Sequence, residues 1–357
     1  MRIELTPRPN PTAVERSLAV IAATLLLFIL GAVIVSIMGK SPADVFYAYV
    51  IYPLSDSWGI EQIILKATPL ALIAIGIAYC ARANLWNVGA EGQYTIGAIL
   101  GGWVAVSTQG TDAGYWVLPL MLILGIIGGM LWGLIPAFLK TRFNVNEILS
   151  SLMLVYIAQQ LLDYLIRGAW KDPKGMNMPI SAIFDSNATL PPLFEGARIH
   201  FELIFAILAI IISAIIFSRT VFGYRLRLTG DAPRAARFAG YDNNNTILIC
   251  FAISGGLAGL AGICEVSGSL NQIMPVISPG YGFTAIIVAF LGRLSPVGIL
   301  FSSFFLALTF IGGENAQLMV KLPFDLTSMF QGLLLLFVLA ADALVSYRLR
   351  IVRGGLN

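Results

Sequence analysis

Long uncharged apolar runs constrain this chain more than any other feature. The run from Leu18 to Met38 contains no charged side chain, and roughly 20 apolar residues suffice for a helix to cross the ~30 Å hydrocarbon core of a bilayer. A cleaved signal peptide would have a shorter apolar stretch followed by a small-residue cleavage site. The whole chain is 58% apolar and 11% charged, against about 25% charged residues in soluble domains. These observations predict an integral membrane protein whose first transmembrane helix is 18–38.

Nine further apolar segments predict an all-α, polytopic membrane protein with about ten transmembrane helices. The expected spans are 18–38, 63–81, 94–107, 116–138, 148–165, 201–217, 246–265, 283–292, 297–311 and 327–345. Several of them are short. The region 283–311 also fits one span plus a re-entrant piece, so both nine and ten spans are compatible with the sequence.

The positive charges orient this arrangement. With the N-terminus inside the cell, most of the 22 Lys and Arg residues fall in inner loops, in agreement with the positive-inside rule. The chain then divides into an inner tail (1–17), a transmembrane domain (18–345) and a second inner tail (346–357). Within the domain, 166–200 forms a long outer loop and 218–245 forms an inner loop.

Polar residues interrupt the apolar pattern between the second and third spans, in the segment Ala83–Gln93. Irregular backbone at membrane depth persists only when it is buried in protein or faces a water-filled cavity. A carboxylate such as that of Glu91 costs at least about 2.5 kcal/mol at the bilayer centre. We expect this segment to line a polar interior; the alternative is an ordinary inner loop with Glu91 at the lipid headgroups. The polar residues are Asn84, Asn87, Glu91 and Gln93.

A second interruption lies in the other half of the chain, at Ser267–Gly282, where Asn271 and Gln272 stand among several glycines and prolines. The expected topology makes helices 2–5 and helices 7–10 run in opposite senses, so the chain would consist of two inverted-topology halves. Paired discontinuities in such halves indicate a transport site at the interface between the repeats.

Small residues recur at three- and four-residue spacing in Gly125–Gly129 and Gly255–Gly262. This spacing lets helix backbones approach closely inside a membrane. We therefore expect the helices to form a tightly packed bundle.

A short basic segment in the inner loop, Gly223–Gly240, has the features of a small helix. Asp231 can cap its first turn and Pro233 fits that turn, since a proline there sacrifices no hydrogen bond. Gly240 can adopt a left-handed conformation and end the helix. A helix of about two turns is unstable by itself. It needs support from its own chain or from a second protein, and an ordinary cytoplasmic connector is the alternative.

The sequence offers no chemistry for catalysis. Cys80, Cys250 and Cys264 fall in or at the ends of predicted spans and indicate no disulfide framework, and His200 is the single histidine. No phosphate-binding loop is present, and no ladder of intramembrane acidic or histidine residues suggests a proton relay. We therefore expect no metal, no cofactor and no ATPase activity in this chain, so that uphill transport would draw its energy from elsewhere.

Three motifs carry a family resemblance: Ala83–Gln93, Gly230–Gly240 running into Ser254–Gly262, and Gly280–Gly292. With them the chain resembles a bacterial ABC-importer permease of the branched-chain amino acid and simple-sugar type. It is most similar to the nucleoside-import permeases that work with basic-membrane-protein-type lipoproteins, over about Leu18 to Leu344.

The resemblance implies a multi-subunit complex in the bacterial inner membrane, with both termini of this chain in the cytoplasm. Its expected partners are a second permease chain, identical or different, two cytoplasmic ATPase subunits that bind ATP, and an extracytoplasmic substrate-binding lipoprotein. The segment Gly230–Gly240 would be the coupling helix that contacts the ATPase. The residues implicated in coupling are Gly230, Asp231, Arg234, Ala235, Ala236, Arg237 and Gly240.

The same resemblance implies that the two interruptions line the substrate pathway. Trp86 would stack on a flat base or sugar, and the long outer loop 166–200 would bind the substrate-binding protein. The pathway residues are then Asn84, Trp86, Asn87, Glu91, Gln93, Asn271 and Gln272.

The implied mechanism is alternating access driven by ATP in the partner subunits, with nucleosides or related simple sugars as substrates. Branched-chain amino acids and ribose-like sugars remain alternative substrates within the same class. A secondary transporter driven by an ion gradient is the alternative from another class, and a non-transporting scaffold or receptor is a second one.

Overall fold

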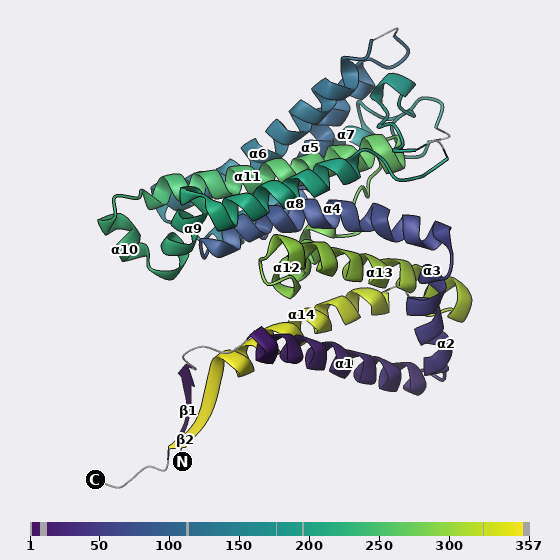
Figure 1. Cartoon of the computed structure of the whole chain (residues 1–357). Helices are drawn as coiled ribbons and strands as arrows, with labels where there is room; N and C mark the ends of the chain where they lie inside the picture. The colour runs from purple at the N-terminus through teal and green to yellow at the C-terminus, as the bar shows by residue number, and fades with distance from the viewer. Residues whose placement is uncertain are drawn as a thin grey trace. The chain divides into compact units, whose positions relative to one another are not determined.

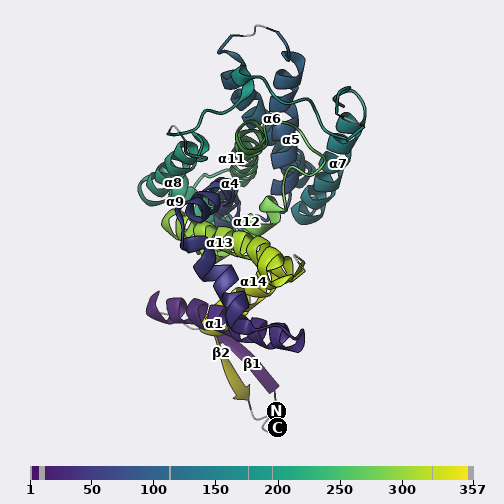
Figure 2. The same cartoon turned by 90° about the vertical axis from the view of Figure 1, so that its right-hand side faces the viewer.

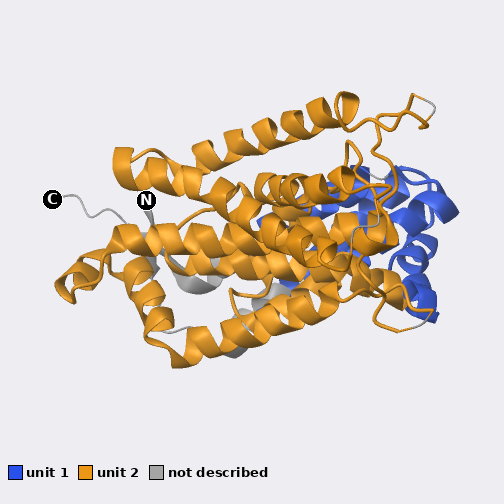
Figure 3. Ribbon diagram, turned by 90° about the horizontal axis from the view of Figure 1, so that it is seen from above, with its two compact units in different colours: residues 1–59, 308–357 blue, residues 60–307 orange. Residues whose placement is uncertain are grey.

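The chain forms two compact units, which Figure 3 shows in different colours. One unit comprises Met1–Gly59 with Leu308–Asn357, and the other comprises Ile60–Ala307. The computed structural model describes residues 2–7, 13–111, 114–175, 177–194, 196–323 and 325–352. Each unit is described by itself below, as unit 1 and unit 2.

Unit 2 is a bundle of long helices (Figure 1). Within it, α11 lies with α5 and α6 on one side and α4 and α8 on the other (Figure 2). A π-helical turn, η3 (Val266–Leu270), extends α11, and a 3₁₀ turn, η2 (Ser186–Ala188), lies between α7 and α8. The helices are α4 (Ser57–Arg82), α5 (Ala90–Ser107), α6 (Val117–Phe143), α7 (Glu147–Arg167), α8 (Glu202–Arg219), α9 (Val221–Asp231), α10 (Pro233–Phe238), α11 (Asn243–Glu265) and α12 (Tyr281–Leu291); α13 (Pro296–Val320) begins in this unit.

Glycines bring α5, α6 and α11 into backbone contact at the centre of unit 2. A Cβ added to Gly97 would lie 2.3 Å from the Cα of Gly259, and one added to Gly129 would lie 2.1 Å from the carbonyl oxygen of Gly255. No side chain fits at these crossings, because van der Waals contact requires well over 3 Å. The close helix packing expected from the small-residue spacing is confirmed.

Local sequence signals set the connection between α6 and α7. Asn144 ends α6 in a left-handed conformation (φ 55°), and the Asn146 side chain accepts a hydrogen bond from the N–H of Ile148 at 2.9 Å, which caps α7. Lys140 and Glu147 form an ion pair at 2.6 Å across this turn. Capping and a left-handed Asn are the expected devices for reversing a helix within a few residues.

Unit 1 is built from the two ends of the chain. Helix α1 packs along α14, where Gly31 lies beside the ring of Phe330, and the Tyr49 hydroxyl is hydrogen-bonded to Thr327. The other elements are short, and the C-terminal part of α13 belongs to this unit. Its bounds are β1 (Arg2–Pro7), α1 (Ala13–Ile37), α2 (Pro42–Phe46), the π-helical turn η1 (Tyr47–Ile51), α3 (Tyr52–Leu54), α14 (Asp325–Ser346) and β2 (Tyr347–Val352).

The two expected tails contain one short strand each, while the fold class of the described chain is all-α, as expected. Strands β1 and β2 pair antiparallel, with Arg2 opposite Val352 and Pro7 opposite Tyr347. Apolar and polar residues alternate through Ile3–Thr6 and again through Tyr347–Ile351. That period of two suits a strand. It differs from the continuous apolar run that indicates a membrane span. The rest of the described chain is helical with irregular connections.

The helices match the expected spans in position, and the expected count of about ten membrane-spanning helices stays a prediction. Among the described residues, six helices are long and apolar enough to do so: α4, α6, α7, α8, α11 with η3, and α13. Three shorter apolar helices cover Thr24–Ile37, Tyr281–Leu291 and Asp325–Val338. With 11 residues, α12 is only about 16 Å long, which favours the re-entrant alternative for that region. Helix α5 coincides with the expected span 94–107 but begins with polar residues. The inverted relation between the halves stays a prediction.

The backbone contacts at the centre of unit 2 generate a stability prediction. Gly259→Ala would place a Cβ 2.2 Å from the carbonyl oxygen of Gly125, so the helices must separate. We expect a loss of about 3 kcal/mol or more, since overpacking a tight core commonly has costs of this order. The measurement is thermal unfolding of the detergent-purified protein.

Gly256→Ala is the matched control on the same helix. The nearest atom to its added Cβ is 3.4 Å away, on the Ile126 side chain, so this variant should unfold within a few degrees of the wild type. Equal unfolding of the two variants would contradict the assigned crossing.

Candidate functional site

The first sequence interruption forms a tight, partly exposed turn between α4 and α5. Asn84 adopts a left-handed conformation (φ 56°) directly after the end of α4 and is exposed. Trp86 is 41% exposed, and one face of its indole stacks on the ring of Phe290 from α12, with centroids 5.2 Å apart. Trp86 therefore already has an aromatic partner within the chain.

Asn87 and Gln93 are buried and bonded to one another. The Asn87 amide nitrogen donates to the Gln93 side-chain oxygen at 2.8 Å and lies 2.9 Å from the Ser254 hydroxyl, and the Gln93 amide donates back to Asn87 at 3.1 Å. Both side chains are at most 2% exposed. Reciprocal pairing satisfies polar groups that would be costly to bury alone. This network joins the start of α5 to α11.

Glu91 caps the second interruption. It is 3% exposed, and one of its carboxylate oxygens accepts a hydrogen bond of 2.5 Å from the N–H of Gly282, in the first turn of α12. The N-terminus of a helix has unpaired N–H groups and a partial positive charge, and a carboxylate satisfies both. The Glu91 carboxylate is thus buried within the protein, and its depth in the membrane stays a prediction.

Gly282 allows this contact. A Cβ at this position would lie 2.3 Å from the backbone nitrogen of Glu91. The Ser278 hydroxyl accepts from the N–H groups of Gly280 and Tyr281, at 3.0 and 2.8 Å, and completes the cap of α12. The two interruptions, 191 residues apart in sequence at this hydrogen bond, therefore meet at a single helix end.

The long connection between α7 and α8 covers the other end of the second interruption. Three carbonyl groups there accept hydrogen bonds from its backbone N–H groups: Ser267 from Leu190 (2.8 Å), Asn271 from Phe184 (2.8 Å) and Ile273 from Ser181 (2.9 Å). Asn271 is left-handed (φ 54°), and both it and Gln272 are half-buried. The sequence reasoning missed this role of the connection. The glycines and prolines of the second interruption were a signal for it, because a buried segment that is not helical needs hydrogen-bond partners for its backbone from another part of the chain.

The expected small helix in the inner loop exists, but Asp231 does not cap it. Asp231 is the last residue of α9, and α10 begins after Ala232, which makes no side-chain cap. The prediction was wrong because Val221–Asp231 is itself helical, capped by Thr220. Pro233 does occupy the first turn of α10, and Gly240 is left-handed (φ 82°) just after its end, as expected.

The exposed face of α10 differs from the expected one at two residues. Arg234, Ala235 and Arg237 are exposed, whereas Ala236 is fully buried against its own chain. Phe238, which the sequence reasoning did not select, is 94% exposed. An aromatic ring exposed to this degree next to basic residues is typical of a binding surface. Asp231 and Gly240 flank this face and are also exposed.

Helix α9 is fixed to the bundle by a basic side chain and a glycine. The Arg225 guanidinium donates to the Thr246 hydroxyl and to the carbonyl of Asp242, both at 2.7 Å. A Cβ on Gly230 would lie 2.4 Å from the carbonyl oxygen of Arg82, so α9 touches the end of α4. Gly230 therefore acts through packing, and α10 is held on a supported base.

Arg82 joins this base to α12 and α13. Its guanidinium donates twice to the carbonyl of Leu294, at 3.0 and 2.8 Å, and lies 4.0 Å from the ring centroid of Phe217 on α8. Leu294 is in the turn that follows α12. The Arg82 side chain thus contacts α8 and the α12–α13 turn, and its backbone carbonyl lies against α9.

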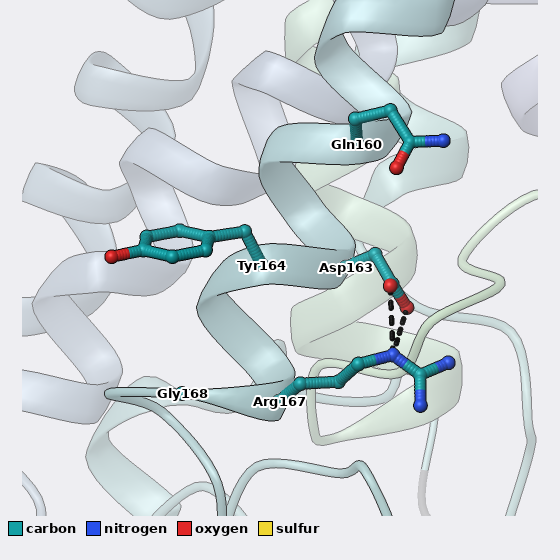
Figure 4. Close-up of a pocket in the computed structure, with 5 residues that line it drawn as sticks. All are labelled: Gln160, Asp163, Tyr164, Arg167 and Gly168. Atoms are coloured by element: carbon teal, nitrogen blue, oxygen red, sulfur yellow. Dashed lines mark hydrogen bonds and ion pairs between the residues drawn. The ribbon is translucent and has the colours of Figure 1, made fainter.

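A surface pocket lies apart from these residues, at the end of α7 (Figure 4). Gln160, Asp163, Tyr164, Arg167 and Gly168 line it, and Asp163 pairs with Arg167 at 2.7 Å. The charged groups of this pocket satisfy each other. It shares no residue with either interruption.

A charge-neutralising variant tests the cap of α12. Glu91→Gln keeps the shape of the side chain but removes the charge at the helix N-terminus. We expect the free energy of unfolding to fall by about 2 kcal/mol, as for the loss of a hydrogen bond to a charged group. Asp163→Asn, which removes an exposed carboxylate from the pocket on α7, should leave the thermal midpoint unchanged. A wild-type midpoint for Glu91→Gln would contradict the cap.

Comparison with known proteins extends over most of the chain. Residues 59–339 match the family model described as branched-chain amino acid transport system / permease component. The glucose ABC transporter permease protein of Haloferax volcanii is 33% identical over 98% of this chain and 94% of its own length. The guanosine ABC transporter permease protein of Bacillus subtilis is 31% identical over 92% of each chain. The nucleoside ABC transporter permease protein NupB of Lactococcus lactis is 29% identical over 77% of this chain and 78% of its own.

Proposed function

Because this chain belongs to the permease family of the branched-chain amino acid transport system, we propose that it forms the pathway for nucleosides or closely related sugars in an ABC importer. The observation that carries this proposal is the similarity, over nearly the full length, to permeases named for guanosine and for glucose. The chain is an ABC transporter permease subunit and a multi-pass membrane protein. It is not an enzyme, since the ATPase is a separate component in this family.

Membership of the ABC permease class favours ATP-driven transport over the ion-gradient-driven transport that was the alternative. An ABC permease obtains its energy from a partner ATPase and does not need an ion gradient. We propose a plasma-membrane location with both termini in the cytoplasm, on the basis of the charge distribution. In Figure 1, α10 lies at the opposite end of unit 2 from the long α7–α8 connection. That arrangement fits an inner coupling surface and an outer surface for the binding protein.

The exposed face of α10 is the proposed contact with the ATPase. Phe238 offers an apolar anchor that is almost wholly accessible, and Arg234 and Arg237 on the same helix offer positive charge. Interface energies concentrate in such aromatic and arginine residues. The buried Ala236 attaches the helix to its own chain, so force applied at Phe238 would reach α9.

The path from this surface to the interior runs through the first interruption. Helix α9 touches the end of α4 at Gly230, Arg82 connects α4 to the α12–α13 turn, and Glu91 holds the N-terminus of α12. We propose that ATP binding in the partner shifts these elements together and changes which side of the membrane the interior faces. A partner drives such a change only by binding one state better than the other.

The substrate is proposed to be a nucleoside, with a hexose as the second candidate. Two relatives are named for guanosine and nucleosides, and one is named for glucose. The exposed part of Trp86 favours a flat ring, because an indole stacks on a base or on the apolar face of a sugar. By resemblance, the binding protein carries much of the selectivity in this class.

Substitutions on α10 test the coupling surface. Phe238→Ala should weaken association with the ATPase roughly 30-fold, the effect of losing an anchor of about 2 kcal/mol. Arg234→Glu combined with Ala235→Trp should abolish association and uptake while the protein still inserts in the membrane. Pull-down of the ATPase subunits and uptake of labelled solute measure the two effects.

Tyr115→Ala is the matched control, because Tyr115 is 93% exposed and precedes α6. It should leave ATPase association unchanged. Normal uptake by the Arg234→Glu, Ala235→Trp variant would show that coupling occurs elsewhere.

Competition measurements test the substrate class. In a complex reconstituted with the ATPase, the binding protein and the second permease, unlabelled guanosine should suppress uptake of labelled uridine, whereas leucine should not. Purified alone in vesicles, the permease should accumulate nothing against a gradient. Suppression by glucose but not by guanosine would assign the complex to hexoses.

A further inference from the structure

Three buried polar side chains that the pathway described above does not use lie near one another in unit 2. They are Tyr94 on α5, Glu202 in the first turn of α8 and Glu265 at the end of α11, and they are 0%, 5% and 8% exposed. Backbone packing brings their segments together. A Cβ on Gly262, three residues before Glu265, would lie 2.1 Å from the Tyr94 carbonyl oxygen, and one on Gly268 would lie 3.3 Å from the ring of His200, two residues before Glu202. The two carboxyl groups also influence each other and the Tyr94 hydroxyl electrostatically. Sequence reasoning did not predict this group, because its members come from three separate helices.

Two atoms of this group lack a partner. Among the described residues, the Tyr94 hydroxyl and the Oε1 atom of Glu202 are fully buried and make no hydrogen bond. Burying polar atoms without partners is unfavourable, and native proteins retain few of them. Their presence at one place indicates a group that binds something else.

The surrounding charges narrow the choice of ligand. Lys66 of α4 interacts electrostatically with Glu265, and Glu91, the other acidic group that influences Tyr94, is bonded to Gly282. The lysine disfavours a metal cation beside it. A carboxylate accepts hydrogen bonds and a phenol both donates and accepts, so the group suits a neutral ligand with several hydroxyls.

The backbone is irregular at this place. Directly after Glu265, α11 changes into the π-helical turn η3, whose Ser267 carbonyl accepts from Leu190 of the α7–α8 connection. Single π-helical turns within longer helices are frequent at functional sites. The Tyr281 ring, next to the capped start of α12, lies edge-to-face with the Tyr94 ring, with centroids 6.3 Å apart. The polar group is thus adjacent to both interruptions of the bundle.

We propose that Tyr94, Glu202 and Glu265 form a binding site for the hydroxyl groups of the transported solute, either a ribose or a hexose. A vicinal diol donates hydrogen bonds to the two carboxyl groups and accepts one from Tyr94. The identity of the solute, a nucleoside or a hexose, rests on the proposed function. The position of the site does not depend on it. A hydrogen bond from a hydroxyl to a carboxylate is stronger than one between neutral groups. A solute that lacks these hydroxyls would lose those bonds, so the site distinguishes solutes by their hydroxyls and not by their base.

The test compares uridine with 2′,3′-dideoxyuridine in the complete reconstituted complex. Every variant receives solute from the same binding protein, so a change in the uptake ratio of the two nucleosides comes from the permease. Tyr94→Phe and Glu202→Gln should lower uridine uptake at low concentration about tenfold and change dideoxyuridine uptake less than twofold. The ratio is expected to shift in this way because a site that bonds a hydroxyl loses its preference when its partner atom is removed.

Tyr79→Phe is the control variant. Its buried hydroxyl is bonded to Ser213 at 3.1 Å, and its removal should leave the ratio unchanged. An equal fall in uptake of both nucleosides in Tyr94→Phe and Glu202→Gln would overturn the proposal. Uptake that depends on Na⁺ or K⁺ in the wild type, and loses that dependence in Glu202→Gln, would also overturn it and assign the carboxyl groups to a cation.

A wrong assignment of the solute can be distinguished from a wrong assignment of the site, because it changes which solute the wild-type complex takes up. If the wild-type complex transports glucose and no nucleoside, the same variants are compared with glucose and 2,3-dideoxyglucose, which has no vicinal diol on its ring. The site then predicts the same selective loss for the fully hydroxylated sugar. An unchanged ratio in both pairs of solutes refutes the site whichever solute the complex carries.

Discussion

The need to pair every backbone polar group away from water governs unit 2. In a membrane, a chain that leaves helical conformation must find partners for its N–H and C=O groups within the protein. This chain does so twice. Glu91 and Ser278 satisfy the first turn of α12, and the α7–α8 connection satisfies the carbonyls of the second interruption. The interrupted segments are thus stable only together, and moving one disturbs the others.

Backbone contact between helices gives this arrangement a firm frame. Glycines at the crossings of α5, α6 and α11 leave no room for a side chain. Packing of this kind is not continuously deformable, because small displacements lose many contacts at once. A transporter that alternates between two states therefore has a reason to place its irregular, polar segments beside such a frame, where a limited set of groups can rearrange.

The first interruption occupies the middle of the proposed coupling route. Its Arg82 end contacts the base that supports α10, and its Glu91 end holds α12. The buried pair Asn87 and Gln93 fixes the segment to α11 between these points. Four residues selected as pathway lining thus have structural partners within the chain: Trp86, Asn87, Glu91 and Gln93. Their contact with solute remains a prediction, while the polar group around Tyr94 offers hydrogen-bonding atoms that have no partner in the described part of the chain.

Sequence alone determined the class of the molecule and the place of most helices. Apolar runs of membrane-spanning length, the distribution of Arg and Lys, and the small-residue spacing depend on local composition, and each expected span lies on a helix. Pro233 and Gly240 were placed correctly because turn chemistry is local as well. Asp231 was misplaced because its capping potential was outweighed by the helix that precedes it.

Tertiary structure alone decided which distant groups meet. The hydrogen bond from Gly282 to Glu91, the exposure of Phe238 with the burial of Ala236, and the grouping of Tyr94, Glu202 and Glu265 each depend on how helices cross. A polar residue within an apolar run shows that a partner is required, but periodicity cannot name that partner. The crossing angles and the rotation of each helix supply this information, and they arise from the packing of the whole bundle.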